Sequence, residues 1–350
     1  MPMLMSMHSM SAVMRRAFLV LFGALITESG VNAEIFKKED LMRGTTITHA
    51  QCEATAQTLW LNVDGRDFCV RYYLSTAGGE GARPAVILQG DQLGKFNVKT
   101  LTWTDTSEAK DRDTNDIVRE LDLLSKLAKT TAIHLGRIGL DGTSGSHMAR
   151  GSQLELDLAN AALDALKQRY GFEGFHLAGQ SGGSRLSAGL LWTRHDISCV
   201  VLGSGRFDAF EAPKSKDLAR TFFDSTQHIA QIVQNRDAHL YFVTDKADKR
   251  VPASHQNGFV DKLRHAGRQV PQFFVEATDD LHHGVFLYTE ITTAGCILDR
   301  PQEEIARAVA TVTKRNAERN EQRRREIGAK ASILAAARQP SENAEPSGKP

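Results

Sequence analysis

One serine stands in the sequence surroundings of a catalytic nucleophile. Residues 179–183 read Gly-Gln-Ser-Gly-Gly and match G-x-S-x-G, between an apolar run over 175–178 and a helix expected from residue 184. A nucleophile elbow needs this strand–turn–helix context, because the strained turn that exposes the serine leaves no room for side chains beside it. We therefore expect Ser181 to be a nucleophile. The alternative is a glycine-rich turn that carries an incidental serine.

A serine hydroxyl becomes an effective nucleophile only when a base takes its proton and a carboxylate orients that base. The candidates follow two later apolar runs that we expect to be strands: Asp245 and Asp248 after residues 240–243, and His282 and His283 after residues 273–275. Serine, acid and histidine thus occur in the chain order of the α/β-hydrolases, each at a strand end.

Three segments together carry a resemblance to a known family. D-x-x-V-P begins at Asp248, H-G-x-F begins at His283, and G-x-S-x-G precedes both. With these motifs, residues 55–300 resemble the catalytic domain of the prolyl oligopeptidase and dienelactone hydrolase-like branch of the α/β-hydrolase superfamily, as a stand-alone hydrolase domain. The resemblance implies that Ser181 is the nucleophile, Asp248 the acid and His283 the base.

Asp245 and His282 are the competing candidates for the acid and the base. Asp245 stands where relatives usually carry a glycine, and His282 is not followed by the glycine that marks the base. We therefore expect turnover to depend on Asp248 and His283 and to survive the loss of either competitor.

The tetrahedral oxyanion of acyl transfer needs two backbone N–H donors. Gly182, the residue after the nucleophile, is expected to supply one. The other is expected from the turn after the apolar run 84–88, where relatives often have His-Gly and this sequence has Gln-Gly-Asp at 89–91. This departure leaves Asp91 and Gln92 as alternative donors. The Asp91 carboxylate would oppose an oxyanion unless its side chain points away.

A glycine-rich segment, residues 137–147, follows another predicted strand and is expected to border the same cleft. Arg137 could bind a substrate carboxylate, and His147 could line the pocket. The alternative is a plain loop between a strand and a helix, in which Arg137 pairs with Asp141.

The elements that must position these residues alternate between strand and helix. Residues 58–75 alternate apolar and polar positions around Asp64-Gly65, which predicts an antiparallel hairpin. The short, continuously apolar runs that follow are typical of a parallel sheet buried on both faces: 84–88, 132–135, 175–178, 200–202, 240–243 and 273–275. Helices are expected over 116–128, from a capping box at Ser152 to Tyr170, and over 184–193, 254–266 and 302–320. This pattern predicts an α/β-hydrolase fold with a mostly parallel central sheet, an N-terminal antiparallel hairpin and helices on both faces.

The first 33 residues have the pattern of a secretory signal peptide. Two arginines precede an apolar run over 17–26, which is too short to span a bilayer, and Val31-Asn32-Ala33 suits a cleavage site. The alternative is an uncleaved membrane anchor. An exported chain meets an oxidising compartment, so the four cysteines are expected to pair. Three connectivities are possible, and neighbourhood in sequence favours Cys52 with Cys69 and Cys199 with Cys296.

Several segments lie outside the predicted core. Residues 34–54 form an N-terminal segment before the hydrolase domain. Residues 206–235 are long for a connection and rich in phenylalanine, so we expect a small cap over the site; the alternative is a core-packed excursion. A solvated C-terminal helix is expected over 301–337, followed by a disordered tail over 338–350.

The formal net charge of +1 provides no field that would attract nucleic acid or a membrane surface. No cysteine and histidine spacing suggests a metal site, and the expected chemistry uses no cofactor. We therefore expect a secreted or periplasmic serine hydrolase that cleaves a small-molecule ester through an acyl-enzyme. An amide-cleaving peptidase is the nearest alternative, although resembling peptidases usually carry a propeller domain and only residues 34–54 precede the domain here. A non-catalytic binding protein of the same fold is the other alternative.

Overall fold

The structure is a computed structural model, and it describes residues 34–92, 96–97, 102–103, 111–208 and 222–337. The expected signal peptide over 1–33 and the tail over 338–350 therefore lie outside the described residues. Within the described residues, no helix is both long and apolar enough to cross a membrane.

The predicted hairpin opens the domain. Strands β2 (Thr58–Val63) and β3 (Arg66–Ser75) pair antiparallel from Val63 opposite Arg66. Asp64 and Gly65 both adopt left-handed backbone angles, with φ of 52° and 70°. Two left-handed residues make the tight turn whose twist matches the strands, which is why Asp-Gly was an informative pair.

Six further strands complete an eight-stranded sheet. They are β4 (Ala85–Leu88), β8 (Ala132–Leu135), β9 (Phe175–Gln180), β10 (Ile197–Gly203), β11 (His239–Asp245) and β12 (Gln272–Val275). The order across the sheet is β12-β11-β10-β9-β4-β8-β3-β2. These six strands run parallel to one another, and β3 joins them antiparallel through β8. This is the predicted α/β-hydrolase fold, with β9, the strand that leads to Ser181, near the middle of the sheet.

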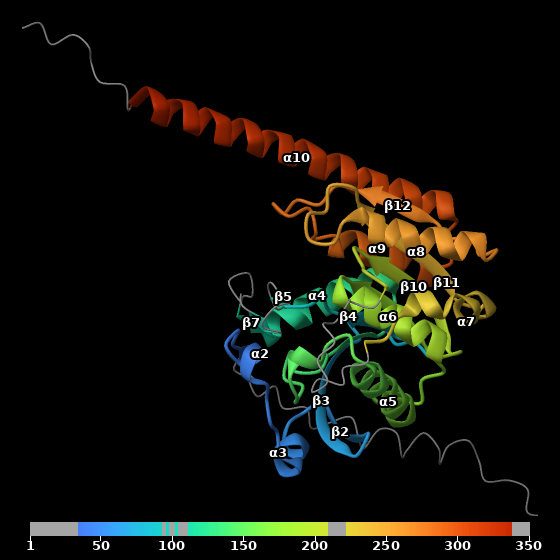
Figure 1. Cartoon of the computed structure of the whole chain (residues 1–350). Helices are drawn as coiled ribbons and strands as arrows, with labels where there is room; N and C mark the ends of the chain where they lie inside the picture. Colours follow the sequence, from blue (N-terminus) through green and yellow to red (C-terminus); the bar gives the residue numbers. More distant parts are fainter. Residues whose placement is uncertain (1–33, 93–95, 98–101, 104–110, 209–221, 338–350) are drawn as a thin grey trace, which may run out of the picture. The chain divides into compact units, whose positions relative to one another are not determined.

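Helices cover both faces of the sheet, as predicted. The longer ones are α4 (Thr114–Ala128), α5 (Gln153–Tyr170), α6 (Gly182–Thr193), α8 (Ala253–His265), α9 (Phe286–Ile297) and α10 (Gln302–Ala337). Alternate strand residues point to opposite faces, so Val86 and Leu88 share a core with α5, α6 and α8. Ala85 and Ile87 pack instead with α4 and α9. The long helix α10 lies along α9 and β12 on that second side (Figure 1).

Helix α9 was missed in the sequence analysis for a physical reason. Its buried positions include four polar side chains, Thr289, Glu290, Thr292 and Thr293. A helix buried on most sides lacks the apolar stripe by which an amphipathic helix is recognised.

The remaining elements are short. They are β1 (Ile35–Phe36), α2 (Asp40–Arg43), α3 (His49–Ala54), β5 (Phe96–Asn97), β6 (Thr102–Trp103), β7 (Arg112–Asp113), η1 (His147–Ala149), η2 (Ser225–Gln227) and α7 (Ile229–Gln234). β1 pairs with β7, and β5 pairs with β6, each as a separate two-stranded sheet.

Both favoured disulfide pairings are present. Cys52 in α3 is bonded to Cys69 in β3, and Cys199 in β10 is bonded to Cys296 in α9. The first bond closes a separation of 17 residues, whereas the second closes 97 and ties the sheet to a covering helix. The sequence-based expectation of paired cysteines is therefore confirmed.

The expected cap over 206–235 is described only at its two ends. Phe207 stacks on Phe259 and meets Phe242 edge-on, so it belongs to the core. Phe223 is likewise buried, 4% exposed, within the same core cluster. Residues 209–221 lie outside the described residues. The ends of the segment thus follow the core-packed alternative.

Candidate active site

The candidate residues lie at or after the carboxyl ends of strands in the parallel part of the sheet. Ser181 comes directly after β9, Asp248 follows β11, His283 follows β12 and Asp91 follows β4. Parallel strands present these ends at one edge of the sheet, where α/β proteins form their sites. The fold therefore gathers residues that are far apart in the sequence.

Ser181 has a backbone conformation that few non-glycine residues adopt. Its φ is 55° and its ψ is −120°, at the junction where β9 ends and α6 begins. Such a conformation costs on the order of 1–3 kcal/mol and persists only where the surroundings enforce it. Here the Ser181 N–H donates to Gly203 O of the neighbouring strand at 2.8 Å. The strain holds the side chain out of the turn, as a nucleophile elbow requires.

The glycines on either side of Ser181 are required by close packing. A Cβ atom on Gly179 would lie 2.5 Å from Gly183 O, and one on Gly183 would lie 1.8 Å from Leu88 O. Both distances are shorter than any real contact of a Cβ atom, so β9, the elbow and β4 could not approach as they do. The spatial reason expected for the G-x-S-x-G pattern is thus present.

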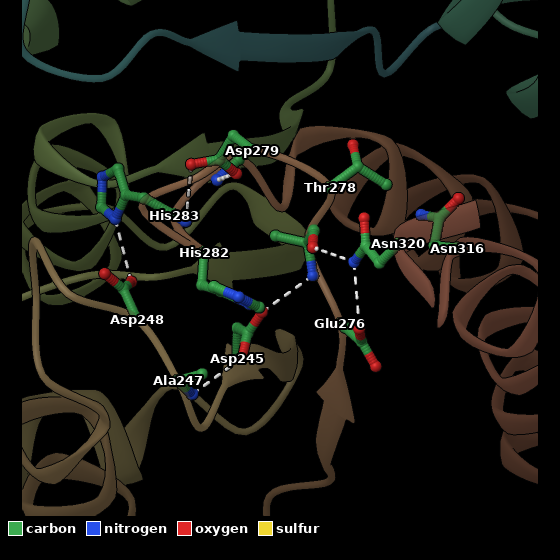
Figure 2. A network of polar contacts seen from close by, with 12 residues as sticks. Asp245, Ala247, Asp248, Glu276, Thr278, Asp279, His282, His283, Asn316 and Asn320 are labelled. Atoms are coloured by element: carbon green, nitrogen blue, oxygen red, sulfur yellow. Dashed lines mark hydrogen bonds and ion pairs between the residues drawn. The ribbon is translucent and has the colours of Figure 1, made fainter. Parts of the chain in front are cut away.

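His283 and Asp248 form a close pair beside the end of β11 (Figure 2). His283 Nδ1 lies 2.9 Å from Asp248 Oδ2, and both side chains are nearly buried, 9% and 2% exposed. The other carboxylate oxygen accepts the backbone N–H groups of Arg250 and Val251, each at 2.9 Å. Because the carboxylate can only accept, the imidazole carries its proton on Nδ1 and keeps the lone pair on Nε2. A histidine in this tautomer is a competent base.

A second histidine–aspartate pair lies next to the first (Figure 2). His282 Nδ1 is 3.1 Å from Asp245 Oδ2. The Asp245 carboxylate also accepts the N–H groups of Ala247 and Ala277, each at 2.8 Å. Asp245 therefore ties together the ends of β11 and β12. The two neighbouring candidates thus pair with each other, and neither intervenes between Asp248 and His283.

The loop that carries the two histidines is held from within by Asp279, a residue that the sequence analysis did not single out. Its carboxylate accepts the N–H groups of His283, at 3.1 Å, and Gly284, at 2.7 Å. His282 takes a left-handed conformation, with a φ of 55°, so that consecutive side chains point to different aspartates. Aspartate side chains often accept backbone N–H groups in turns, so an aspartate shortly before the His-His-Gly segment is a weak local signal of such a role.

The turn expected to supply the second oxyanion donor lies against Ser181. A Cβ atom on Gly90 would lie 3.2 Å from Ser181 Cβ and 3.9 Å from its Oγ. Asp91 is packed against Gly182, where an added Cβ would lie 1.9 Å from Asp91 Oδ1. The residue after Ser181 must therefore be glycine as long as Asp91 keeps this position.

The Asp91 carboxylate is directed into a buried cluster of arginines. Its Oδ1 accepts from Arg137 Nη1 at 2.8 Å, and its Oδ2 pairs with Arg150 Nε at 3.0 Å. Burial alone would raise the pKa of the Asp91 carboxyl, but the two guanidinium groups outweigh burial and hold that pKa well below its usual range. The negative charge that raised doubt about this residue is thus neutralised by neighbouring cations.

Arg137 is a buried structural cation, with a side chain only 2% exposed. Besides Asp91 it binds Gln89 O at 2.8 Å and Glu155 Oε1 at 2.9 Å. With its guanidinium engaged by protein groups, the geometry does not favour the expected contact with a substrate carboxylate. The expected alternative pairing with Asp141 is also absent from these contacts, because Asp141 binds His134 at 2.7 Å and Arg112 instead. Arg137 holds the Gln89–Asp91 turn.

Glu155 explains why the predicted capping box is incomplete. Ser152 caps α5 as expected, because its hydroxyl accepts the Glu155 N–H at 3.3 Å. The Glu155 carboxylate, however, binds Arg137 and accepts the Gly151 N–H at 2.5 Å, instead of returning to Ser152. The buried arginine outcompetes the helix start for this side chain.

His147 is fully buried beside the same cluster and does not line an open pocket. Its Nδ1 donates to Ile138 O at 3.1 Å, and its Nε2 lies 3.9 Å from Asp91 Oδ1. Burial, reinforced by the charge of Arg137, lowers the pKa of His147 to about 3. The imidazole is therefore neutral at ordinary pH. It acts as packing under the loop, in contrast to the expected role at the pocket wall.

Comparison with protein-family models finds no match, and comparison with curated proteins finds none either. Several solved structures are similar. An esterase of Pyrococcus furiosus is 12% identical with a TM-score of 0.49, covering 73% of this chain and 94% of that one. An α/β-hydrolase of unknown function from Agrobacterium tumefaciens is 19% identical with a TM-score of 0.42, covering 69% and 94%. An acylaminoacyl peptidase of Pyrococcus horikoshii is 11% identical with a TM-score of 0.47, covering 69% and 40%.

Proposed function

We propose that this chain, which has the α/β-hydrolase fold, is a serine hydrolase that cleaves an ester through an acyl-enzyme. Ser181 is the nucleophile, His283 the general base and Asp248 the carboxylate that orients the base. The single observation that supports this most is the buried Asp248–His283 pair, 2.9 Å apart, at the same sheet edge as the strained serine. Fold alone would not carry the proposal, because this fold also hosts other functions.

In the proposed reaction, His283 Nε2 takes the Ser181 proton as Oγ attacks the ester carbonyl. The imidazolium that forms is stabilised by the Asp248 carboxylate, and it then gives its proton to the departing alcohol. Water, activated by the same base, hydrolyses the acyl-enzyme. Each step uses the tautomer that the contact with Asp248 dictates.

The oxyanion is proposed to bind the N–H of Gly182, at the first turn of α6, and the N–H of Asp91. The helix start contributes a partial positive charge as well as the N–H group. The Asp91 side chain supports this role indirectly, because its anchoring by Arg137 and Arg150 fixes the turn and neutralises the carboxylate. Gln92 is the alternative donor.

The experiment that tests the proposal is covalent labelling with a fluorophosphonate probe, together with hydrolysis of aryl esters of graded chain length and of aminoacyl amides. The protein should be labelled at one site, and Ser181→Ala should abolish labelling and lower kcat by about 10⁶-fold. His283→Ala should be comparably inactive, and the double variant no worse, because members of a triad act as one unit. The matched control is His282→Ala, which removes the adjacent imidazole and should stay active. Labelling that persists in Ser181→Ala would overturn the proposal, and an inactive His282→Ala beside an active His283→Ala would shift the base by one residue.

We further propose that the chain is exported and that its mature form starts after Ala33. The support is the signal-like pattern of the first 33 residues together with two disulfides that close every cysteine of the sequence. Disulfides form and persist in oxidising compartments.

A further inference from the structure

We infer that the C-terminal helix α10 acts as a brace that positions the loop of the catalytic base, with Asn320 as its central positioning residue. The inference deepens the proposed function, since it assigns His283 the role of base. Its starting point is the network in Figure 2, in which α10 side chains reach the backbone just after β12.

Asn320 makes the central contact. Its Nδ2 donates to Ala277 O at 3.0 Å and to Glu276 Oε1 at 2.9 Å. Both acceptors belong to the first two residues after β12, at the base of the loop that carries His283. One side chain on α10 thus fixes the point at which the loop leaves the sheet.

Two further residues on the same side of α10 extend the brace, at the spacing of successive helical turns. Asn316 Nδ2 donates to Tyr288 Oη at 2.8 Å, and that hydroxyl donates to Glu276 O at 2.7 Å. Arg323 donates to Thr278 O at 3.3 Å and pairs with Asp280 at 3.1 Å. The loop is therefore held along about two turns of the helix, with a buried contact at one end and an exposed one at the other.

The braced residues connect to the histidines through Asp245. Ala277 is held on both sides, because its carbonyl accepts from Asn320 while its N–H donates to Asp245 Oδ2 at 2.8 Å. The same oxygen of Asp245 contacts His282, the residue before the base. A continuous path of hydrogen bonds thus runs from α10 through Ala277 and Asp245 to the residue adjacent to His283.

The position of β12 explains why this loop needs support. β12 is four residues long and lies at the edge of the sheet, and among the described residues its one neighbouring strand is β11. Its third residue, Phe274, is 46% exposed, so burial of this side chain does little to fix the strand. A base that must meet the Ser181 hydroxyl tolerates little displacement, since a shift of about 1 Å can cost about 100-fold in rate. Helix α10 supplies the contacts that a second neighbouring strand would otherwise give.

The test compares two asparagine truncations. Asn320→Ala removes an amide that donates to two acceptors at the base of the loop. The matched control is Asn235→Ala, because Asn235 Nδ2 also donates to two acceptors, Leu191 O at 3.0 Å and Arg194 O at 2.9 Å, at the far end of α6. The readouts are kcat and KM on an aryl ester, the rate of fluorophosphonate labelling, and amide hydrogen exchange of residues 276–284.

Asn320→Ala should lower kcat and the labelling rate by about three- to tenfold, leave KM within about twofold, and speed exchange in the loop. Asn235→Ala should lower the free energy of unfolding by about as much as Asn320→Ala does, and it should leave kcat, KM, the labelling rate and the exchange of residues 276–284 unchanged. If Asn320→Ala is too unstable to purify, Arg323→Ala serves in its place and should give a smaller loss of kcat. Its exposed neighbour Arg324 supplies the control, because Arg324→Ala should leave kcat unchanged. Unchanged kcat in Asn320→Ala, or equal losses in Asn320→Ala and Asn235→Ala, would overturn the brace. Failure of the proposed function is recognised separately, because the wild type would then not be labelled at Ser181, while loop exchange would still report on the brace.

Discussion

Asp248→Asn should stop catalysis while leaving the fold intact, because the neighbours of Asp248 dictate how the new amide sits. Asp248 Oδ1 accepts the backbone N–H groups of Arg250 and Val251, whereas Oδ2 lies 2.9 Å from His283 Nδ1. An asparagine at this position must keep its carbonyl oxygen on the two N–H donors, since turning the amide would set its NH2 group against them. The NH2 group then faces His283.

The consequence for His283 is the wrong tautomer. Its Nδ1 has to accept a hydrogen bond from the asparagine, so the ring proton moves to Nε2, the nitrogen that takes the Ser181 proton in the proposed reaction. The ring can then no longer take the serine proton. The corresponding substitution in a serine protease triad lowers kcat about 10⁴-fold, and we expect a loss of that size here. The free energy of unfolding should stay within about 1.5 kcal/mol of the wild type, because the hydrogen bonds to the backbone remain.

Asp245→Asn is the matched control, with the opposite expectation. Asp245 uses one oxygen on the Ala247 N–H and the other on the Ala277 N–H, each at 2.8 Å. Either orientation of an asparagine sets its NH2 group against a backbone donor. We therefore expect a loss of about 1–3 kcal/mol in the free energy of unfolding, and turnover within about tenfold of the wild type.

The two variants are compared by steady-state kinetics on the best ester found and by urea unfolding monitored by circular dichroism. The reasoning fails if Asp248→Asn keeps more than about a tenth of the wild-type kcat. It also fails if Asp245→Asn is the inactive variant, because Asp245 would then be the acid of the triad.

Two further predictions concern pH and export. The folded state keeps the His147 imidazole neutral, with a pKa of about 3, whereas in the unfolded chain the imidazole takes up a proton below about pH 6.5. Between these two values the unfolded state binds more protons than the folded state. The free energy of unfolding should therefore fall as the pH falls through this window, by up to about 1.4 kcal/mol per pH unit. His147→Gln, in which an amide can still donate to Ile138 O, should show a shallower decline in urea titrations between pH 7 and 4, and parallel declines would contradict the assignment. For export, intact mass of the secreted protein should correspond to a start after Ala33, with all four cysteines resistant to alkylation until reduced. An unprocessed N-terminus or four free thiols would count against it.

The sequence alone determined much of the fold because local patterns act over short distances. Continuous apolar runs, the Asp-Gly turn and the strand–G-x-S-x-G–helix succession each require only neighbouring residues, and each corresponds to an element of the structure. The order of the candidate residues along the chain, from Ser181 through Asp248 to His283, could likewise be read directly. The one long helix missed, α9, is buried on most sides and so leaves no periodic stripe.

Tertiary structure decided which of the neighbouring candidates pair. Asp245 and Asp248 are three residues apart, and His282 and His283 are adjacent, so spacing leaves every combination open. His282 adopts a left-handed backbone conformation, and Asp245 accepts the N–H of Ala277 just after β12. Together these features separate the two pairs. These contacts join residues more than 30 positions apart, and local sequence carries no record of them.

Burial likewise decided the fate of the charged residues around the elbow. From the sequence, Arg137 and His147 were as suited to a substrate as to the interior, because residue type does not reveal exposure. The structure surrounds Arg137 with Asp91 and Glu155 and encloses His147 completely. The sequence did not reveal the role of Asn320 either, because this residue lies in a highly charged helix without a local motif. Only the packing of α10 along β12 brings its amide to the loop of His283. Local chemistry thus specified the candidates, and long-range packing selected the partners of each, because the free energy of a buried charge depends on groups that the chain supplies from distant positions.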